Sequence, residues 1–448
     1  MASTSNFADP SEDNGTIIQG QYAIICKQGG EQIRSMRILP KQNLLIEKLK
    51  VNTDALIGQP FGLFEINSGI PAPISFAKLL ADGTVDIDAQ VENSSTEAPQ
   101  YAPSSDQAAL NDAQARQKYS EEEIDEMKRK GASASELVAK LVEGSQTFHN
   151  RTEYAKSKYI RKKARKHSDR IFVLRPTVRL LCESYYKKDA DRIGNLRWDQ
   201  LGLILQLAGV HSGKRVVMFE QSCGILASAV LERLGGRGSM IYLHRGLQAQ
   251  GIPCVQAMNF SSQVMGTLHS LRIDTLLNDG IPREDREIPP GMPKQETSDS
   301  IVSENLLNQR DEEKEEESTV MINIEKRAER SSQQRMAYAQ LCNGYDALLI
   351  STRTVDPVSL LEFLYESLRP CGTVVIYSPN QQSMVLAQSW LRAKGAVNIQ
   401  IQEQMFRIHQ VLPQRTHPLM SQMVVGGCIV SAIKVVGPPP VPQASHTA

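Results

Sequence analysis

Apolar, strand-like segments alternate with helical segments through the second half of the chain, and this pattern restricts the fold more than any other feature. Strands are predicted at residues 170–174, 215–220, 239–244, 345–351 and 372–378. Helices are predicted among them at residues 226–234, 357–368 and 382–394. Such alternation is typical of a parallel sheet that helices cover on both faces. Two last strand-like segments, 397–405 and 423–436, have no helix between them and predict an antiparallel pair at one edge.

A sheet of seven strands that ends in an antiparallel pair is the architecture of Rossmann-like S-adenosylmethionine-dependent methyltransferases, an α/β fold. In this fold the cofactor lies at the carboxyl ends of the first strands, where the strand order reverses. The first strand ends in an acidic residue and a Gly-x-Gly-x-Gly loop, whose glycines let the backbone approach the cofactor. Glu220 and Gly224 stand at the expected places, but Ser222 and Leu226 occupy two of the three glycine places.

Two further positions of this cofactor site differ from the pattern. The second strand should end in an acid that binds the cofactor ribose, and it ends in His244. Losing a hydrogen bond to a charged group costs about 1.5–3 kcal/mol. In a base-methylating enzyme an acid should follow the strand at 345–351, where Ser351 stands instead, followed by Thr352 and Arg353. We therefore expect a degenerate site with no bound cofactor and no catalytic residue; Glu220 and Gly224 are equally well explained as strand-end and turn residues.

Positive charge is concentrated locally in a chain whose net charge is zero, with 50 Lys and Arg against 50 Asp and Glu. Residues 151–170 contain nine Lys or Arg against Glu153 and Asp169, with Tyr154 and Tyr159 interleaved. Like charges four residues apart destabilise a helix, so a polyphosphate backbone is the natural partner of this segment. A nuclear-localisation signal at residues 161–166 and a solvated helix face are the alternatives.

Two other segments carry clustered basic residues. Lys187, Lys188, Arg192 and Arg197 lie around the stretch from Tyr185 to Trp198. The proline-bracketed loop 406–418 precedes the last strand and contains two arginines and two histidines, Arg407, His409, Arg415 and His417. Such a loop has donors for phosphates and base edges, although a hairpin connection with incidental charge explains it equally well. The isolated histidines at 211, 244 and 269 lack the spacing of metal ligands, so no metal site is predicted.

The rest of the chain divides by composition. We predict a small β-rich, barrel-like domain at residues 1–80, a flexible linker at 81–117 and a helical basic connector at 118–168. The methyltransferase-like domain is placed at 169–437, with an acidic insertion at 283–332 that is expected to be disordered, and a Pro-rich tail at 438–448. Capping boxes at Ser120 with Glu123 and at Ser133 with Glu136 mark helix starts, and Asn150 with Glu153 is predicted to begin the basic helix. Seven scattered cysteines argue against a disulfide framework, and no apolar run approaches the roughly 20 residues that cross a bilayer.

Several of these motifs resemble those of a known family, the non-catalytic subunits of the eukaryotic tRNA adenosine-58 N1-methyltransferase. The most specific are residues 147–154, which lead into 158–163, and residues 410–418. Residues 197–201 and the loop from Glu220 to Gly224 are also similar. The resemblance implies a homologous catalytic subunit as partner, in a heterotetramer of two plus two, with tRNA bound. No membrane contact is expected, because the chain has no apolar run long enough to cross a bilayer. We expect such a complex in the nucleus.

The resemblance also implies which residues contact tRNA. They are Lys158, Tyr159, Arg161, Lys162, Lys163, Arg165, Lys166, Lys188, Arg192, Asn195, Arg353, Arg407, Gln410, Arg415 and His417. Two alternatives stay open: an active S-adenosylmethionine-dependent RNA methyltransferase with an atypical cofactor loop, and a general RNA-binding or translation scaffold.

Overall fold

The chain forms two compact units, one of residues 12–184 and one made mainly of residues 185–448. The computed structural model describes residues 15–28, 32–47, 49–67, 69–74, 119–129, 134–145, 148–246, 252–286, 309–412, 415–420, 422 and 424–436. The predicted linker at 81–117 and the Pro-rich tail at 438–448 lie outside these ranges. None of the helices in the described ranges combines the length and apolar character that a membrane span requires.

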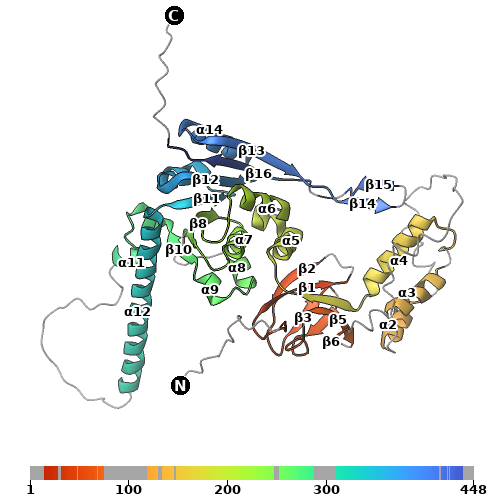
Figure 1. The fold of residues 1–448 in the computed structure, drawn as a ribbon. Helices are drawn as coiled ribbons and strands as arrows, with labels where there is room; N and C mark the ends of the chain where they lie inside the picture. Colours follow the sequence, from red (N-terminus) through yellow and green to blue (C-terminus); the bar gives the residue numbers. More distant parts are fainter. Residues whose placement is uncertain are drawn as a thin grey trace, which may run out of the picture. The chain divides into compact units, whose positions relative to one another are not determined.

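The N-terminal unit contains an antiparallel five-stranded sheet in the order β2-β1-β7-β5-β6 (Figure 1). Its strands are β1 (Tyr22–Lys27), β2 (Ile33–Arg37), β5 (Gly62–Asn67), β6 (Ile70–Pro73) and β7 (Arg170–Leu174). A separate hairpin of β3 (Asn43–Ile46) and β4 (Leu49–Asn52) contributes to the same core, in which Leu44 and Val51 lie with Ile25 and Phe64. The prediction of an N-terminal β domain is confirmed.

Strand β7 belongs to this sheet and not to the methyltransferase-like sheet, so the domain boundary predicted at residue 169 is wrong. Ile171 pairs with Lys27 of β1 and with Phe64 of β5, which makes β7 the central strand. Its apolar side chains Ile171 and Val173 are fully buried in the N-terminal core. The boundary between the two units falls instead within α5 (Val178–Asp189), between Ser184 and Tyr185.

Three helices precede β7 in the described part of the N-terminal unit: α2 (Glu121–Arg129), α3 (Ala134–Glu143) and α4 (Glu153–His167). The capping box at the start of α2 is present, because Ser120 N–H donates to the Glu123 carboxylate at 2.9 Å and Glu123 N–H donates to Ser120 Oγ at 3.2 Å. Ser133 lies outside the described residues. Helix α4 is capped by Thr152, whose hydroxyl accepts from Ala155 N–H at 3.3 Å, so the start predicted at Asn150 is two residues too early.

The C-terminal unit contains a seven-stranded sheet in the order β10-β9-β8-β11-β12-β16-β13. Its strands are β8 (Arg215–Glu220), β9 (Ser239–His244), β10 (Leu268–Arg272), β11 (Tyr345–Ser351), β12 (Leu368–Ser378), β13 (Val397–Met405) and β16 (Val425–Ile433). Strands β10, β9, β8, β11 and β12 pair in parallel, and β16 lies antiparallel between β12 and β13. This order confirms the predicted Rossmann-like fold, with β10 rather than β7 as its seventh strand.

Helices cover both faces of this sheet. One face packs against α6 (Trp198–Leu207) and α7 (Ile225–Leu234), beside the short helices α8 (Pro253–Ala257) and α9 (Ser262–Met265). The other face packs against α13 (Pro357–Leu364), α14 (Gln381–Ala393) and the C-terminal turns of α12 (Gln309–Cys342). The core on that side joins Phe219 and Ile350 of the sheet to Leu341, Leu361 and Met384 of the three helices.

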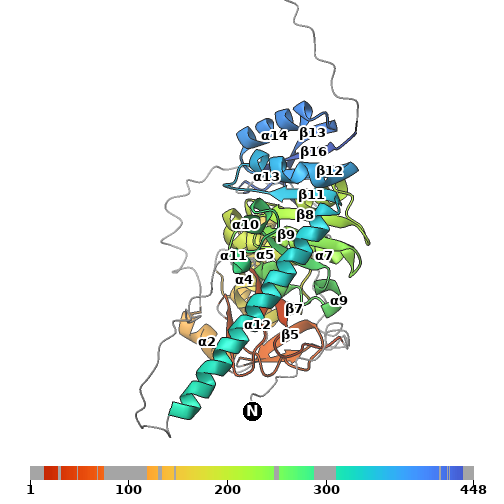
Figure 2. The ribbon, with the colours of Figure 1, turned by 90° about the vertical axis from the view of Figure 1, so that its left-hand side faces the viewer.

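The insertion predicted as disordered at 283–332 is helical in its described parts, which form α11 (Arg283–Arg286) and the first two thirds of α12 (Figure 2). Residues 287–308 lie outside the described residues. Glu, Lys, Arg and Gln, which dominate this sequence, are all good helix formers, so a charged composition does not exclude a long helix.

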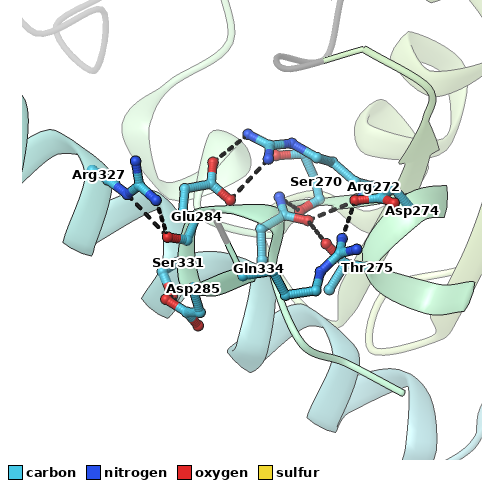
Figure 3. A network of polar contacts seen from close by, with 10 residues as sticks. Ser270, Arg272, Asp274, Thr275, Glu284, Asp285, Arg327, Ser331 and Gln334 are labelled. Atoms are coloured by element: carbon cyan, nitrogen blue, oxygen red, sulfur yellow. Dashed lines mark hydrogen bonds and ion pairs between the residues drawn. The ribbon is translucent and has the colours of Figure 1, made fainter. Parts of the chain in front are cut away.

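A polar network anchors α12 to the end of β10 (Figure 3). Arg272 and Glu284, 3% and 9% exposed, form an ion pair with a shortest N–O distance of 2.6 Å. Gln334 of α12 accepts from Arg272 N–H at 2.7 Å and donates to Ser270 C=O at 3.0 Å. Buried ion pairs and hydrogen bonds of this kind require fixed geometry, so the helix is held firmly where these residues lie.

Candidate nucleic-acid interface and the changed cofactor site

The carboxylate of Glu220 at the end of β8 is occupied by the protein's own donors. It accepts from Ser222 Oγ at 2.6 Å and from the N–H groups of Leu226 and Ala227, at 3.1 and 3.3 Å, in the first turn of α7. Burial raises the pKa of Glu220 to about 7, although these three hydrogen bonds favour the charged form. Glu220 therefore caps a helix whose N-terminal N–H groups have no partner within the helix.

Position 224 requires glycine because the backbone has a positive φ there and packs closely against Ile252. Its φ of +82° is unfavourable for other residues, and a β-carbon at this position would lie 2.8 Å from Ile252 Cα. The backbone of Ile252 thus packs directly against Gly224 and leaves no room for a side chain at this position. Cys254 N–H also donates to Cys223 C=O at 3.2 Å, which fixes the start of α8 against this loop.

The other changed positions lie beside Glu220 at the same edge of the sheet. His244 is 5% exposed, and burial followed by the positive charge of Arg272 lowers its pKa, so the imidazole is neutral at pH 7. A carboxylate can accept from both ribose hydroxyls, whereas a neutral imidazole has one acceptor nitrogen. Ser351, which pairs with Glu220, is also buried. The residues at this site do not fit a bound methyl donor.

The basic helix α4 presents three lysines on one side. Lys158, Lys162 and Lys166 are exposed and four residues apart, so they lie along one face of the helix. Lys163 is half-buried, and burial together with the charges of Lys166 and Lys162 lowers its pKa. Side chains of Arg161 and Arg165 lie outside the described residues. An RNA backbone would relieve the mutual repulsion of these lysines.

Tyr159 has a structural contact that sequence reasoning missed. Its hydroxyl donates to Leu141 C=O of α3 at 3.3 Å, and its ring lies 5.7 Å from that of Phe148. Arg151 and Lys163 both lie over the ring, at 4.8 and 5.5 Å from its centroid. Tyr159 is therefore a platform that holds two cations and is not a freely exposed stacking residue.

Three of the predicted contacts in the C-terminal unit, Arg192, Asn195 and Arg353, lie close to the altered cofactor loop. Lys188, Arg192 and Arg353 are exposed. The guanidinium of Arg353 donates to Asp191 C=O at 2.6 Å, and Asn195 Nδ2 donates to the Asp191 carboxylate at 3.2 Å.

Backbone groups of Arg353 and Arg192 also form hydrogen bonds with side chains of the loop that follows β8. Arg353 N–H donates to Gln221 Oε1 at 2.8 Å, and Cys223 Sγ donates to Arg192 C=O at 3.4 Å. The structure thus brings Arg353 next to Arg192 and Asn195, although Arg353 lies more than 150 residues further along the chain.

The predicted loop at 406–418 is a β-hairpin of β14 (His409–Leu412) and β15 (Arg415–Pro418). Gln410 pairs with His417, and Leu412 pairs with Arg415. Arg407 and His417 are exposed, while the side chains of Gln410 and Arg415 lie outside the described residues. Val411 and Met420 expose 74% and 95% of their surface, so the hairpin offers both apolar and charged groups.

Arg197, which the sequence places with the basic cluster around Trp198, is not available to a phosphate. It is 1% exposed, and its guanidinium makes four hydrogen bonds, to the Asp199 carboxylate and to the carbonyls of Gln404 and Val424. The local sequence before α6 does not indicate that Arg197 is buried, because both carbonyls that it binds come from segments more than 200 residues away.

Comparison with known proteins places these features in a family context. Residues 16–330 match the model of the Gcd10p family. The non-catalytic subunit trm6 of tRNA (adenine(58)-N(1))-methyltransferase from Dictyostelium discoideum is 27% identical over 432 residues, which cover 94% of this chain and 80% of that protein. The subunit of the same name from Mus musculus is 24% identical over 459 residues, which cover 94% and 88%. A solved SAM-dependent O-methyltransferase from Thermotoga maritima has a TM-score of 0.50 at 9% identity, covers 96% of this chain and 98% of its own, and shows the fold alone.

Proposed function

Because the chain belongs to the Gcd10p family, we propose that it is the non-catalytic, tRNA-binding subunit of a methyltransferase that modifies adenosine 58 of tRNA at N1. The observation that carries this proposal is the state of the site at the end of β8. Glu220 caps α7, Ile252 covers Gly224, and a neutral His244 stands at the ribose position. A homologous catalytic subunit supplies the methyl donor site, and this chain supplies positive surface for tRNA.

The positive surface of the proposal has two parts, one in each unit. Helix α4 carries the exposed lysines in the N-terminal unit. In the C-terminal unit Arg192, Asn195 and Arg353 lie together. The hairpin β14–β15 carries His417, and Arg407 lies just before its first strand. A tRNA is a folded shape recognised largely through phosphates and 2′-hydroxyls, so a broad set of donors suits it. A heterotetramer of two copies of each subunit, located in the nucleus, completes the proposal.

Coexpression with a homologous chain that has the complete glycine loop and the ribose acid tests this division of labour. We expect a stable complex on size-exclusion chromatography, with two copies of each chain by native mass spectrometry, that methylates tRNA. Isothermal titration of this chain alone with S-adenosylmethionine should give no binding at micromolar concentration, because the ribose acceptor is missing. Micromolar binding would favour an active enzyme with an atypical loop, and the lack of a complex would favour a general RNA scaffold.

The cation platform at Tyr159 gives a second test within the proposed function. Tyr159→Leu removes the ring beneath Arg151 and Lys163, and we expect tRNA affinity to fall about threefold to tenfold with a flatter salt dependence. Tyr159→Phe keeps the ring and loses only the hydrogen bond to Leu141 C=O, which is worth about 1 kcal/mol of stability. Filter binding across a salt series should therefore separate the two variants. Equal affinities for both would show that the platform has no part in binding.

A further inference from the structure

We infer that Arg197 and Gln200 are positioning residues that fix the hairpin β14–β15 at its root, and that tRNA binding by this hairpin depends on them. The second half of the inference rests on the proposed function. The first half concerns the C-terminal unit alone and can be tested without RNA.

Arg197 joins the two chain segments between which the hairpin is inserted. Its Nη2 donates to Gln404 C=O at 2.8 Å, near the end of β13, and its Nη1 donates to Val424 C=O at 3.1 Å, just before β16. The Asp199 carboxylate holds the guanidinium in place through Nε and Nη2, at 2.8 and 2.9 Å. A planar guanidinium with donors in fixed directions can bridge these groups at once, whereas an ammonium cannot.

Gln200 makes a second bridge one turn further along α6. Its Oε1 accepts from Arg197 N–H at 3.3 Å, and its Nε2 donates to Gly427 C=O of β16 at 2.7 Å. A β-carbon at Gly426 would lie 2.4 Å from Gln200 Oε1, and one at Gly427 would lie 2.7 Å from the Tyr377 ring. The two glycines of β16 therefore let α6 and β12 approach the strand closely.

An aromatic contact covers the same junction. The ring of Trp198 meets that of Phe406 edge to face at 5.2 Å, and Arg197 lies 5.9 Å from the centroid of the Phe406 ring. Phe406 N–H donates to Val424 C=O at 3.0 Å. Residues 197–201 and Gly426-Gly427 thus form one junction, although more than 200 residues separate them in sequence.

The hairpin needs such an anchor because it has little support of its own. Among the described strands, β14 and β15 pair only with each other, and an isolated two-stranded hairpin is at best marginally stable in water. Gln422 adds a local link, since its side chain accepts from Ile408 N–H at 2.7 Å and donates to Leu419 C=O at 2.8 Å. The direction in which Arg407 and His417 point is consequently set at the root.

Hydrogen–deuterium exchange on the coexpressed complex tests the positioning. We expect Arg197→Lys to lower amide protection at least tenfold within residues 404–427. A matched control is Arg272→Lys, which alters a buried, ion-paired arginine of the same unit that contacts α11 instead. Unchanged protection in Arg197→Lys, or the same loss in the control, would overturn the inference. Gln200→Met, which removes the bridge to Gly427, serves in place of Arg197→Lys if that variant does not fold.

A double-mutant comparison tests the dependence of tRNA binding. We expect Arg197→Lys and the paired change Arg407→Ala with His417→Ala each to weaken tRNA binding about tenfold, and the triple variant to be no weaker than either. If the losses of tRNA affinity add up in the triple variant, Arg197 acts on binding independently of the hairpin. That result would overturn the inference that tRNA binding by the hairpin depends on Arg197. If the paired change alone leaves tRNA binding intact, the hairpin contact of the proposed function fails, while hydrogen exchange still decides the positioning role.

Discussion

Replacing Lys158, Lys162 and Lys166 together with alanine will weaken tRNA binding by the assembled complex roughly a hundredfold at physiological salt. The three lysines are exposed and share one face of α4. Each phosphate contact adds about 0.7–0.9 to the slope of log affinity against log salt. Loss of three contacts should therefore lower that slope by about 2–3, as measured by filter binding between 50 and 300 mM salt.

A matched change of Lys41, Lys50 and Lys326 to alanine is the control. These lysines are also exposed, and they lie outside both parts of the proposed positive surface. We expect the control complex to keep its affinity and its salt slope, with both triple variants eluting as intact complexes. A slope that is the same for the α4 variant and the wild type would remove this helix from the tRNA interface.

Replacing Glu220 with glutamine will change how stability depends on pH. The pKa of Glu220 rises from its ordinary value of 4.5 to about 7 in the folded protein, because the carboxylate is buried. Between these two values the folded state holds a proton that the unfolded state has released. The free energy of unfolding therefore falls as pH rises from about 4.5 to about 7. At about 1.4 kcal/mol per pKa unit, the whole effect is roughly 3 kcal/mol.

Glutamine cannot ionise, so the free energy of unfolding of Glu220→Gln should not fall between about pH 4.5 and 7. The variant should therefore become more stable relative to the wild type as pH rises to 7. Chemical denaturation at pH 5, 6, 7 and 8 measures the difference. Glu366→Gln, whose side chain is 73% exposed, controls for the removal of one carboxylate. A difference between Glu220→Gln and wild type that does not vary with pH would mean that the three hydrogen bonds outweigh burial.

Most of the C-terminal fold was predictable, because buried parallel strands such as β8 and β11 are continuous apolar runs. The two errors in strand membership have different causes. The apolar segment at β7 is typical of a strand in either sheet. The sequence alone does not say which strands it pairs with, so it was assigned to the wrong sheet. Strand β10 is an edge strand with polar His269 and Ser270 on partly exposed positions, so it lacks the apolar pattern by which its neighbours were found.

The candidate site was predictable where charge accumulates locally and not where side chains meet across the fold. The lysines of α4 are visible as a run in the sequence. The grouping of Arg192 with Arg353 depends on the sheet order, which brings the end of β11 next to that of β8. Arg197 was misassigned for the same reason, since its partners Gln404 and Val424 lie far along the chain.

The central place of β7 in its sheet has a mechanical consequence for the neighbouring helix. Only Ser168 and Asp169 separate α4 from β7, and β7 is hydrogen-bonded along both sides, to β1 and to β5. A force that pulls on α4, such as the thermal motion of a large bound polynucleotide, would have to break two ladders of backbone hydrogen bonds to remove β7 from the sheet. An edge strand would be held by one ladder, so the central position makes this connection harder to tear from the sheet.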